Sequence, residues 1–188
     1  ADVFPRRLAA SYANLEQPFA KQLDVPEDRR FIGFDAYRKA MDCLRPGDVV
    51  LLTTSSAFRP LHFEYAVQKG VHVFMEKSFA SDPVGARKVI ECGEAAEKRN
   101  LKIAAGLMCR HSVNRQELMK RIQDGQLGGP PQLIRAYRME PVGPMSPKRP
   151  ADLSELMWQI RNRIHILWVS GGLWAEMDIH QIDEICWL

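Results

Sequence analysis

Short apolar runs alternate with amphipathic segments through the middle of the chain. The apolar runs are 48–54, 71–75 and 101–106, and the amphipathic segments between them are 59–70 and 82–100. The runs have the length of buried strands, whereas the other two segments repeat their apolar residues at helical spacing. Gly70 is placed to end the first helix, and Asp82 to cap the second. Strands alternating with helices predict right-handed crossovers and therefore an α/β fold with a parallel sheet.

A parallel sheet brings the carboxyl ends of its strands to one edge, where α/β proteins bind their ligands. The polar residues that directly follow the predicted strands are Thr53, Thr54, Glu76 and Lys77, and 106–111 follows the third strand. We expect them to surround one crevice. A lysine at a strand end is usually only solvated. Two interpretations of Lys77 therefore stay open, a solvated surface residue and a functional residue.

The alternation stops after residue 111. The later segments are an amphipathic helix at 112–125, a turn at 128–132, a strand candidate at 132–139, a proline-rich loop at 140–150 and a helix at 173–188. This change predicts two domains, 1–111 and 112–188. The first is the sheet domain, and the second begins with the helix at 112–125.

Composition narrows the classes of partner. The 188 residues carry 26 lysines and arginines against 23 acidic residues, and these charges are interspersed. This balance gives no electrostatic reason to expect nucleic acid or a membrane surface, so we expect a small-molecule partner. The four cysteines are widely spaced, which favours reduced thiols. A cytoplasmic location is favoured, with an export signal before residue 1 left open. The N-terminal stretch 1–10 looks internal to a longer chain and shows no export signal.

Three polar residues share one face of the last predicted helix. Glu176, His180 and Asp183 stand at i, i+4 and i+7. Such a stripe is compatible with a solvated or structural face, an acid/base pair or a metal site, and spacing alone favours the first. Because the rest of the helix is apolar, it should be buried, and buried charges need partners. No metal ligand set is assigned. The remaining histidines have weaker claims to a role: His62, His72, His111 and His165.

Three stretches together resemble the Gfo/Idh/MocA family of nicotinamide-dependent oxidoreductases. They are DVVLLTTSSAFRPLHFEYAVQKGVHVFMEKSFASD (48–82), AAGLMCRHSVNRQELMKRIQDGQLG (104–128) and SELMWQIRNRIHILWVSGGLWAEMDIHQIDEICWL (154–188). The resemblance implies a Rossmann-type, doubly wound parallel sheet whose first βα unit is missing. It also implies that 112–188 begins an α+β domain for substrate binding and oligomerisation. We expect a homo-oligomer when complete.

The resemblance also assigns the site. It implies that Lys77 lies between the nicotinamide and the substrate hydroxyl, that His180 is the acid/base, and that Glu176 orients His180. The implied cofactor-binding residues are Asp2, Arg7, Thr53, Thr54, Ser55, His62, Glu76, Lys77 and Arg110. NAD is expected rather than NADP, because Asp2 would repel a 2′-phosphate, although Arg6 and Arg7 could attract one.

The implied activity is hydride transfer between NAD(P) and a sugar, polyol or related hydroxyl compound. The alternatives are an NAD-using glycoside hydrolase of the same family and a non-catalytic ligand sensor. Ser55, Ser78 and Arg163 depart from the family's pattern. Ser78 replaces the proline of Glu-Lys-Pro, which frees φ, restores an N–H and predicts a less rigid Lys77. The glycine-rich phosphate loop is expected before residue 1, so this stretch alone should be inactive and expose unpaired strand edges.

Overall fold

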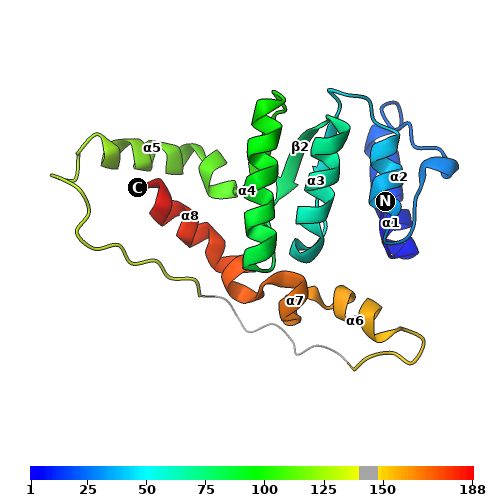
Figure 1. Ribbon diagram of the computed structural model, residues 1–188. Coiled ribbons are helices and arrows are strands. Elements are labelled where there is room, and N and C mark those ends of the chain that lie inside the picture. The colour runs from blue at the N-terminus through cyan, green and yellow to red at the C-terminus, as the bar shows by residue number, and fades with distance from the viewer. Residues whose placement is uncertain (140–147) are drawn as a thin grey trace.

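The computed structural model describes residues 1–139 and 148–188 (Figure 1). Its first part contains α1 (Pro5–Phe19), α2 (Ala36–Asp42), β1 (Val49–Leu52), α3 (Arg59–Lys69), β2 (His72–Glu76), α4 (Pro83–Lys98) and β3 (Ile103–Gly106). The later part contains α5 (Val113–Gln123), α6 (Glu155–Arg161), α7 (Leu167–Ser170) and α8 (Ile179–Trp187). Short 3₁₀ turns are η1 (Glu27–Arg29), η2 (Ser56–Phe58), η3 (Met108–His111) and η4 (Arg163–His165), and η5 (Trp174–Asp178) is a π-helical turn.

The three strands form a parallel sheet in the order β1-β2-β3. Val50 pairs with Val73, and Val73 pairs with Ile103 on the other side. The predicted strand–helix–strand alternation and the α/β class are therefore confirmed. All three strands end at the same edge, which places the segments that follow Leu52, Glu76 and Gly106 side by side. A separate parallel bridge joins Asp2 to Ile32.

Two local signals set the helix ends as the sequence predicts. Asp82 caps α4, since its Oδ1 accepts a hydrogen bond of 2.8 Å from the Gly85 N–H. Gly70 ends α3 in the left-handed conformation, at φ 74°, which a residue without Cβ adopts at no steric cost. The short connections that result allow α3 and α4 to lie next to each other over the sheet (Figure 1).

The core lies between the sheet and these two helices. Its fully or nearly fully buried members include Phe63 and Ala66 of α3, Val73 and Met75 of β2, and Ala96 of α4. The alternate residues of β1 are not covered: Val49 is 57% and Leu51 66% exposed. Among the described residues, β1 and β3 are the edges of the sheet.

The strand predicted at 132–139 is wrong. The structure gives these residues no strand pairing within the described ranges, and Leu133, Tyr137 and Met139 are exposed. A strand forms only where a neighbour supplies hydrogen bonds and a buried face, and this segment has neither here. Most of the proline-rich loop predicted at 140–150 lies outside the described residues. The division into 1–111 and 112–188 stays a prediction.

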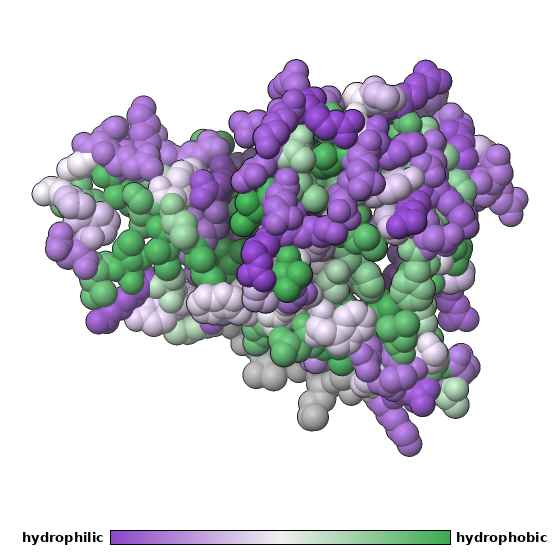
Figure 2. Space-filling view, viewed as in Figure 1, coloured by the Kyte–Doolittle hydropathy of each residue, from purple (hydrophilic) through white to green (hydrophobic). Residues whose placement is uncertain are grey.

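The C-terminal helix predicted at 173–188 is present, but it begins with the π-helical turn η5 and continues as α8. It returns from α7 to the carboxyl edge of the sheet, with α5 beside it (Figure 1). Figure 2 shows apolar side chains in the region of α5 and α8. Val113 and Leu118 of α5 and Ile185 of α8 are exposed. Among the described residues, no helix combines the length and apolar composition needed to cross a membrane.

Val73→Ala tests the position of the core. Val73 is only 2% exposed, so losing two buried methyl groups should reduce the free energy of unfolding by about 2 kcal/mol. Val84, which is exposed on α4, is the matched control. Val84→Ala should change the free energy of unfolding by less than about 0.5 kcal/mol. Urea denaturation followed by circular dichroism measures both. Equal effects of the two substitutions would contradict this core.

Candidate functional site

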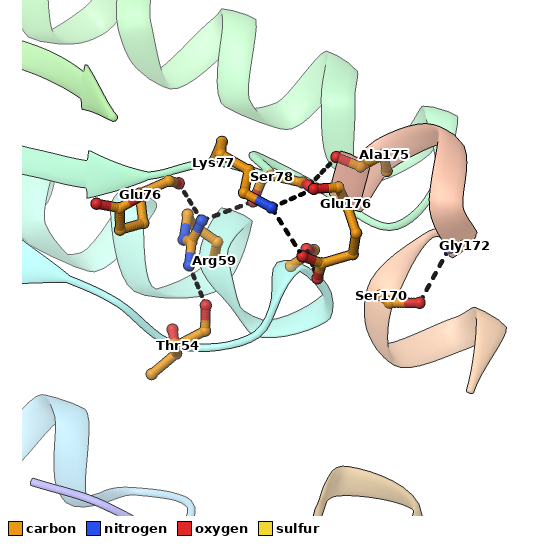
Figure 3. Close-up of polar contacts among 10 residues, drawn as sticks. Thr54, Arg59, Glu76, Lys77, Ser78, Ser170, Gly172, Ala175 and Glu176 are labelled. Atoms are coloured by element: carbon orange, nitrogen blue, oxygen red, sulfur yellow. Dashed lines mark hydrogen bonds and ion pairs between the residues drawn. The ribbon is translucent and has the colours of Figure 1, made fainter. Parts of the chain in front are cut away.

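Lys77 leaves the end of β2 and points toward the C-terminal segment (Figure 3). Its Nζ lies 3.1 Å from Oε2 of Glu176, and it also donates to the main-chain carbonyl of Glu176. The side chains are 19% and 8% exposed, so both charges are largely removed from water. Lys77 is therefore held in one direction by a paired carboxylate and is not a solvated strand-end lysine.

The residues next to this ion pair are buried as well. Ser56 of η2 donates to Glu176 Oε1 over 3.5 Å, a long hydrogen bond. Ser78 is buried, and its Oγ donates to the Ala175 carbonyl. The Lys77–Ser78 peptide bond is cis. The loops after β1 and β2 thus both contact η5.

Arg59 lies between the same two loops and hydrogen-bonds to both (Figure 3). Its Nη2 donates to the Thr54 carbonyl, and its Nη1 donates to the carbonyls of Glu76 and, at 2.7 Å, Ser78. Burial lowers the pKa of this guanidinium to about 10, although the negative charges of Glu176 and Glu76 oppose the decrease. Arg59 is therefore charged at neutral pH.

His180 is buried one turn beyond Glu176. Burial lowers its pKa, and the positive charge of Lys77 lowers it further, so the imidazole is neutral at pH 7. In the part of the chain described, its Nδ1 has no hydrogen-bond partner. Glu176 was expected to orient His180. In the structure, the Glu176 carboxylate instead binds Lys77 and Ser56.

Asp183 completes the polar stripe of this helix. Its carboxylate accepts from Nε and Nη2 of Arg110, at 2.9 Å and 2.8 Å, and the Arg110 guanidinium lies over the Trp187 ring. Arg110 lies in η3, directly after β3. The two carboxylates of the stripe therefore pair with cations that follow β2 and β3, and His180 lies between them in the sequence.

Most of the predicted cofactor residues line a separate cavity of about 270 Å³ at the end of β1. These are Asp2, Arg7, Thr53, Thr54, Ser55 and His62. Asp2 Oδ1 accepts a hydrogen bond of 2.8 Å from the Phe4 N–H. Arg7 lies with its guanidinium over the Phe4 ring. The start of the chain therefore contributes a carboxylate and an arginine to the lining of the cavity.

His62 lies on the wall of this cavity formed by α3. Its Nδ1 is 3.1 Å from Thr54 Oγ1, and its ring stacks on Tyr37 with the centroids 4.1 Å apart. Burial, followed by the charge of Arg59, lowers the pKa of His62 to about 4. His62 is therefore a neutral wall residue at physiological pH.

The remaining predicted residues lie elsewhere. Glu76, Lys77 and Arg110 do not line the cavity. Glu76 turns toward β3, where a Cβ on Gly106 would lie 2.6 Å from Glu76 Oε2, so the carboxylate would have to move to admit a larger residue at position 106. Within residues 1–139 and 148–188, His, Cys, Asp and Glu side chains form no group of three that could hold a metal ion.

Sequence reasoning missed three residues at this edge. Ser56 and Arg59 contact the ion pair or its backbone, and Arg163 lines the cavity from η4. An arginine before the proline of a helix start could have marked Arg59, but arginines are so often exposed that this signal is weak. Arg163 was noted only as a departure from the family pattern.

Comparison with known proteins agrees with this architecture. Inositol 2-dehydrogenase of Klebsiella pneumoniae (strain 342) is 30% identical over 112 residues, which is 58% of this chain and 32% of the relative. The same enzyme of a second K. pneumoniae strain matches equally. The chain thus spans about a third of the length of the curated relatives it matches. No family model matches the sequence.

Solved structures show the same class of fold. Apo scyllo-inositol dehydrogenase from Lactobacillus casei is 26% identical with a TM-score of 0.53, covering 74% of this chain and 35% of that one. Myo-inositol 2-dehydrogenase from Lactobacillus plantarum has a TM-score of 0.57 at 22% identity, covering 84% and 40%. The fold is thus that of Rossmann-type oxidoreductases. The resemblance to the Gfo/Idh/MocA family, which includes inositol dehydrogenases, is confirmed.

The low pKa of His62 predicts a pH-dependent stability. The unfolded chain protonates this imidazole near pH 6.5, but the folded chain does so only near pH 4, so stability is lost as pH falls between these values. The loss should reach about 3 kcal/mol. His62→Gln should remove most of it, whereas His111→Gln, at an exposed histidine, should not. Urea unfolding at several pH values measures this, and an unchanged pH dependence in His62→Gln would contradict the assignment.

Proposed function

We propose that the protein carrying this chain is an NAD-dependent dehydrogenase that acts on a hydroxyl group of a polyol or sugar. The observation that carries the proposal is the placement of Lys77 and His180 at the carboxyl edge of the parallel sheet, where Rossmann-type proteins bind ligands. The inositol 2-dehydrogenases that resemble the chain support a polyol as the substrate.

The cavity residues fit a nicotinamide cofactor. One oxygen of Asp2 is held by the Phe4 N–H, which leaves the other free to accept from ribose hydroxyls. Thr53, Thr54 and neutral His62 offer hydrogen-bonding groups along the wall without adding charge. When bound, the cofactor would supply the hydride acceptor. NAD is favoured over NADP because the Asp2 carboxylate would repel a 2′-phosphate, while Arg7 is occupied over Phe4.

The chain's own residues would handle the proton and the charge. Neutral His180 can take the proton from the substrate hydroxyl, since its lowered pKa leaves the imidazole free to accept. The Lys77 ammonium can donate to the substrate oxygen and stabilise the negative charge that develops there. Glu176 keeps Lys77 aimed. A homo-oligomeric state and a cytoplasmic location stay predictions.

Substitution of the two proposed catalytic residues tests the function. In the full-length protein, Lys77→Met and His180→Asn should each reduce kcat/KM by about 10²–10⁴-fold with an inositol or related polyol, because each removes one contribution to the transition state. The rate is followed by the absorbance of reduced nicotinamide. Lys88→Met, which removes a surface ion pair with Glu64, should retain wild-type activity.

Two outcomes would count against the proposal. The first is wild-type activity in both Lys77→Met and His180→Asn. The second is release of a sugar without net formation of reduced nicotinamide, which would favour the NAD-using glycoside hydrolase. Product analysis by mass spectrometry separates the two reactions.

A further inference from the structure

Arg59 is among the most buried charged residues that the structure describes, at 2% exposure. Within the described residues, its hydrogen-bond acceptors are the carbonyls of Thr54, Glu76 and Ser78, and only its Nε lacks a partner. A buried charge that binds neutral carbonyls is costly, and an apolar side chain would fill this space at a lower desolvation cost. Filling space in the core therefore does not explain why a guanidinium occupies this position.

The three carbonyls have a particular arrangement along the chain. Thr54 follows β1, whereas Glu76 and Ser78 are the two neighbours of Lys77. One planar group thus holds the backbone immediately before and after Lys77 and connects it to the end of the adjacent strand (Figure 3). The donors of a guanidinium have a fixed geometry, so they restrain position and direction together.

We propose that Arg59 is the positioning residue for Lys77. It fixes the main chain on both sides of Lys77, so that the ammonium meets Glu176 and the reacting oxygen in one direction. The proposal rests on the dehydrogenase function proposed above for its kinetic consequence, but its structural part can be measured without any substrate. Arg59 itself, buried beneath the loops, is not expected to touch the substrate.

The electrostatics near Arg59 give an independent reporter. His62 stands three residues further along α3, and Arg59 contributes to its lowered pKa. Among the described residues, the other groups that face His62 are the Thr54 hydroxyl and the rings of Tyr37 and Phe58. Replacement of Arg59 by lysine retains the charge, so His62 should stay neutral, whereas replacement by methionine should raise its pKa. This separates the loss of charge from the loss of geometry.

The main test is Arg59→Lys in the full-length protein. Lysine keeps the positive charge but cannot bind three carbonyls in the planar geometry of arginine, so Lys77 should become loose. Trace acetylation read by mass spectrometry should label Lys77 about fivefold faster or more, relative to Lys98 in the same protein. Glu176→Gln, which removes the ion-pair partner, is the positive control, and Arg87→Met on the exposed side of α4 is the negative control. Protection of the buried thiol of Cys92 confirms that each variant is folded.

Kinetics supply the second readout. A displacement of about 1 Å in a catalytic group can cost about 10²-fold in rate, so we expect kcat of Arg59→Lys to fall by about 10–100-fold. KM for cofactor and polyol should stay within about threefold, because no binding contact is removed. Loss of folded protein would instead lower the concentration of active sites, which titration with reduced cofactor measures.

The outcomes are distinguishable. Unchanged Lys77 labelling and unchanged kcat in folded Arg59→Lys would overturn the proposal. If the wild-type protein transfers no hydride, the proposed function fails. Increased acetylation of Lys77 in Arg59→Lys would still support the proposal that Arg59 positions Lys77. If Arg59→Lys unfolds, the wild type provides the test: guanidinium protons of Arg59 should exchange with solvent much more slowly than those of Arg87, and equal exchange would overturn the proposal.

Discussion

The ion pair between Lys77 and Glu176 joins positions 99 residues apart, and the organisation of the site depends on it. Its Coulomb attraction is largely offset by the desolvation of both groups, so the ion pair is not the main force that holds the C-terminal segment to the sheet. Apolar contacts also join these segments, such as the edge-on packing of Phe58 against Trp168. The pair instead selects one placement of η5 on the sheet edge, because a displaced turn would leave buried charges without partners.

The elements of the sheet domain were predictable, whereas the contacts between distant segments were not. β2 and α4 carry their own signals, which are a short apolar run and the Asp82 cap, and they form as predicted. The segment 132–139 carries a similar apolar pattern but has no described neighbour to pair with. Glu176 and His180 share a helix face, but the Glu176 carboxylate binds Lys77, which sequence spacing could not reveal.

Ser78 shows how a departure from a motif can be accommodated. The family's proline would restrict φ, but it could not donate a hydrogen bond. Ser78 donates from Oγ to the Ala175 carbonyl on η5, and its own carbonyl accepts from Arg59. These two bonds restrain the residue after Lys77 from opposite sides. Loss of the proline therefore does not by itself imply a loose Lys77, because these contacts oppose the reduced rigidity predicted from the sequence.

The same charges that organise the edge also distinguish its two buried histidines. Burial, followed by the charge of Arg59, holds the pKa of His62 at about 4, and a base this weak accepts a proton poorly at neutral pH. His62 is also occupied with Thr54 and stacked on Tyr37. Burial, followed by the charge of Lys77, also lowers the pKa of His180, with Asp183 and Glu76 opposing the decrease, but its Nδ1 is unpaired among the described residues. His62 is thus already engaged on the wall of the cavity at the end of β1, whereas His180 keeps a ring nitrogen available, which agrees with the proton-transfer role proposed for it.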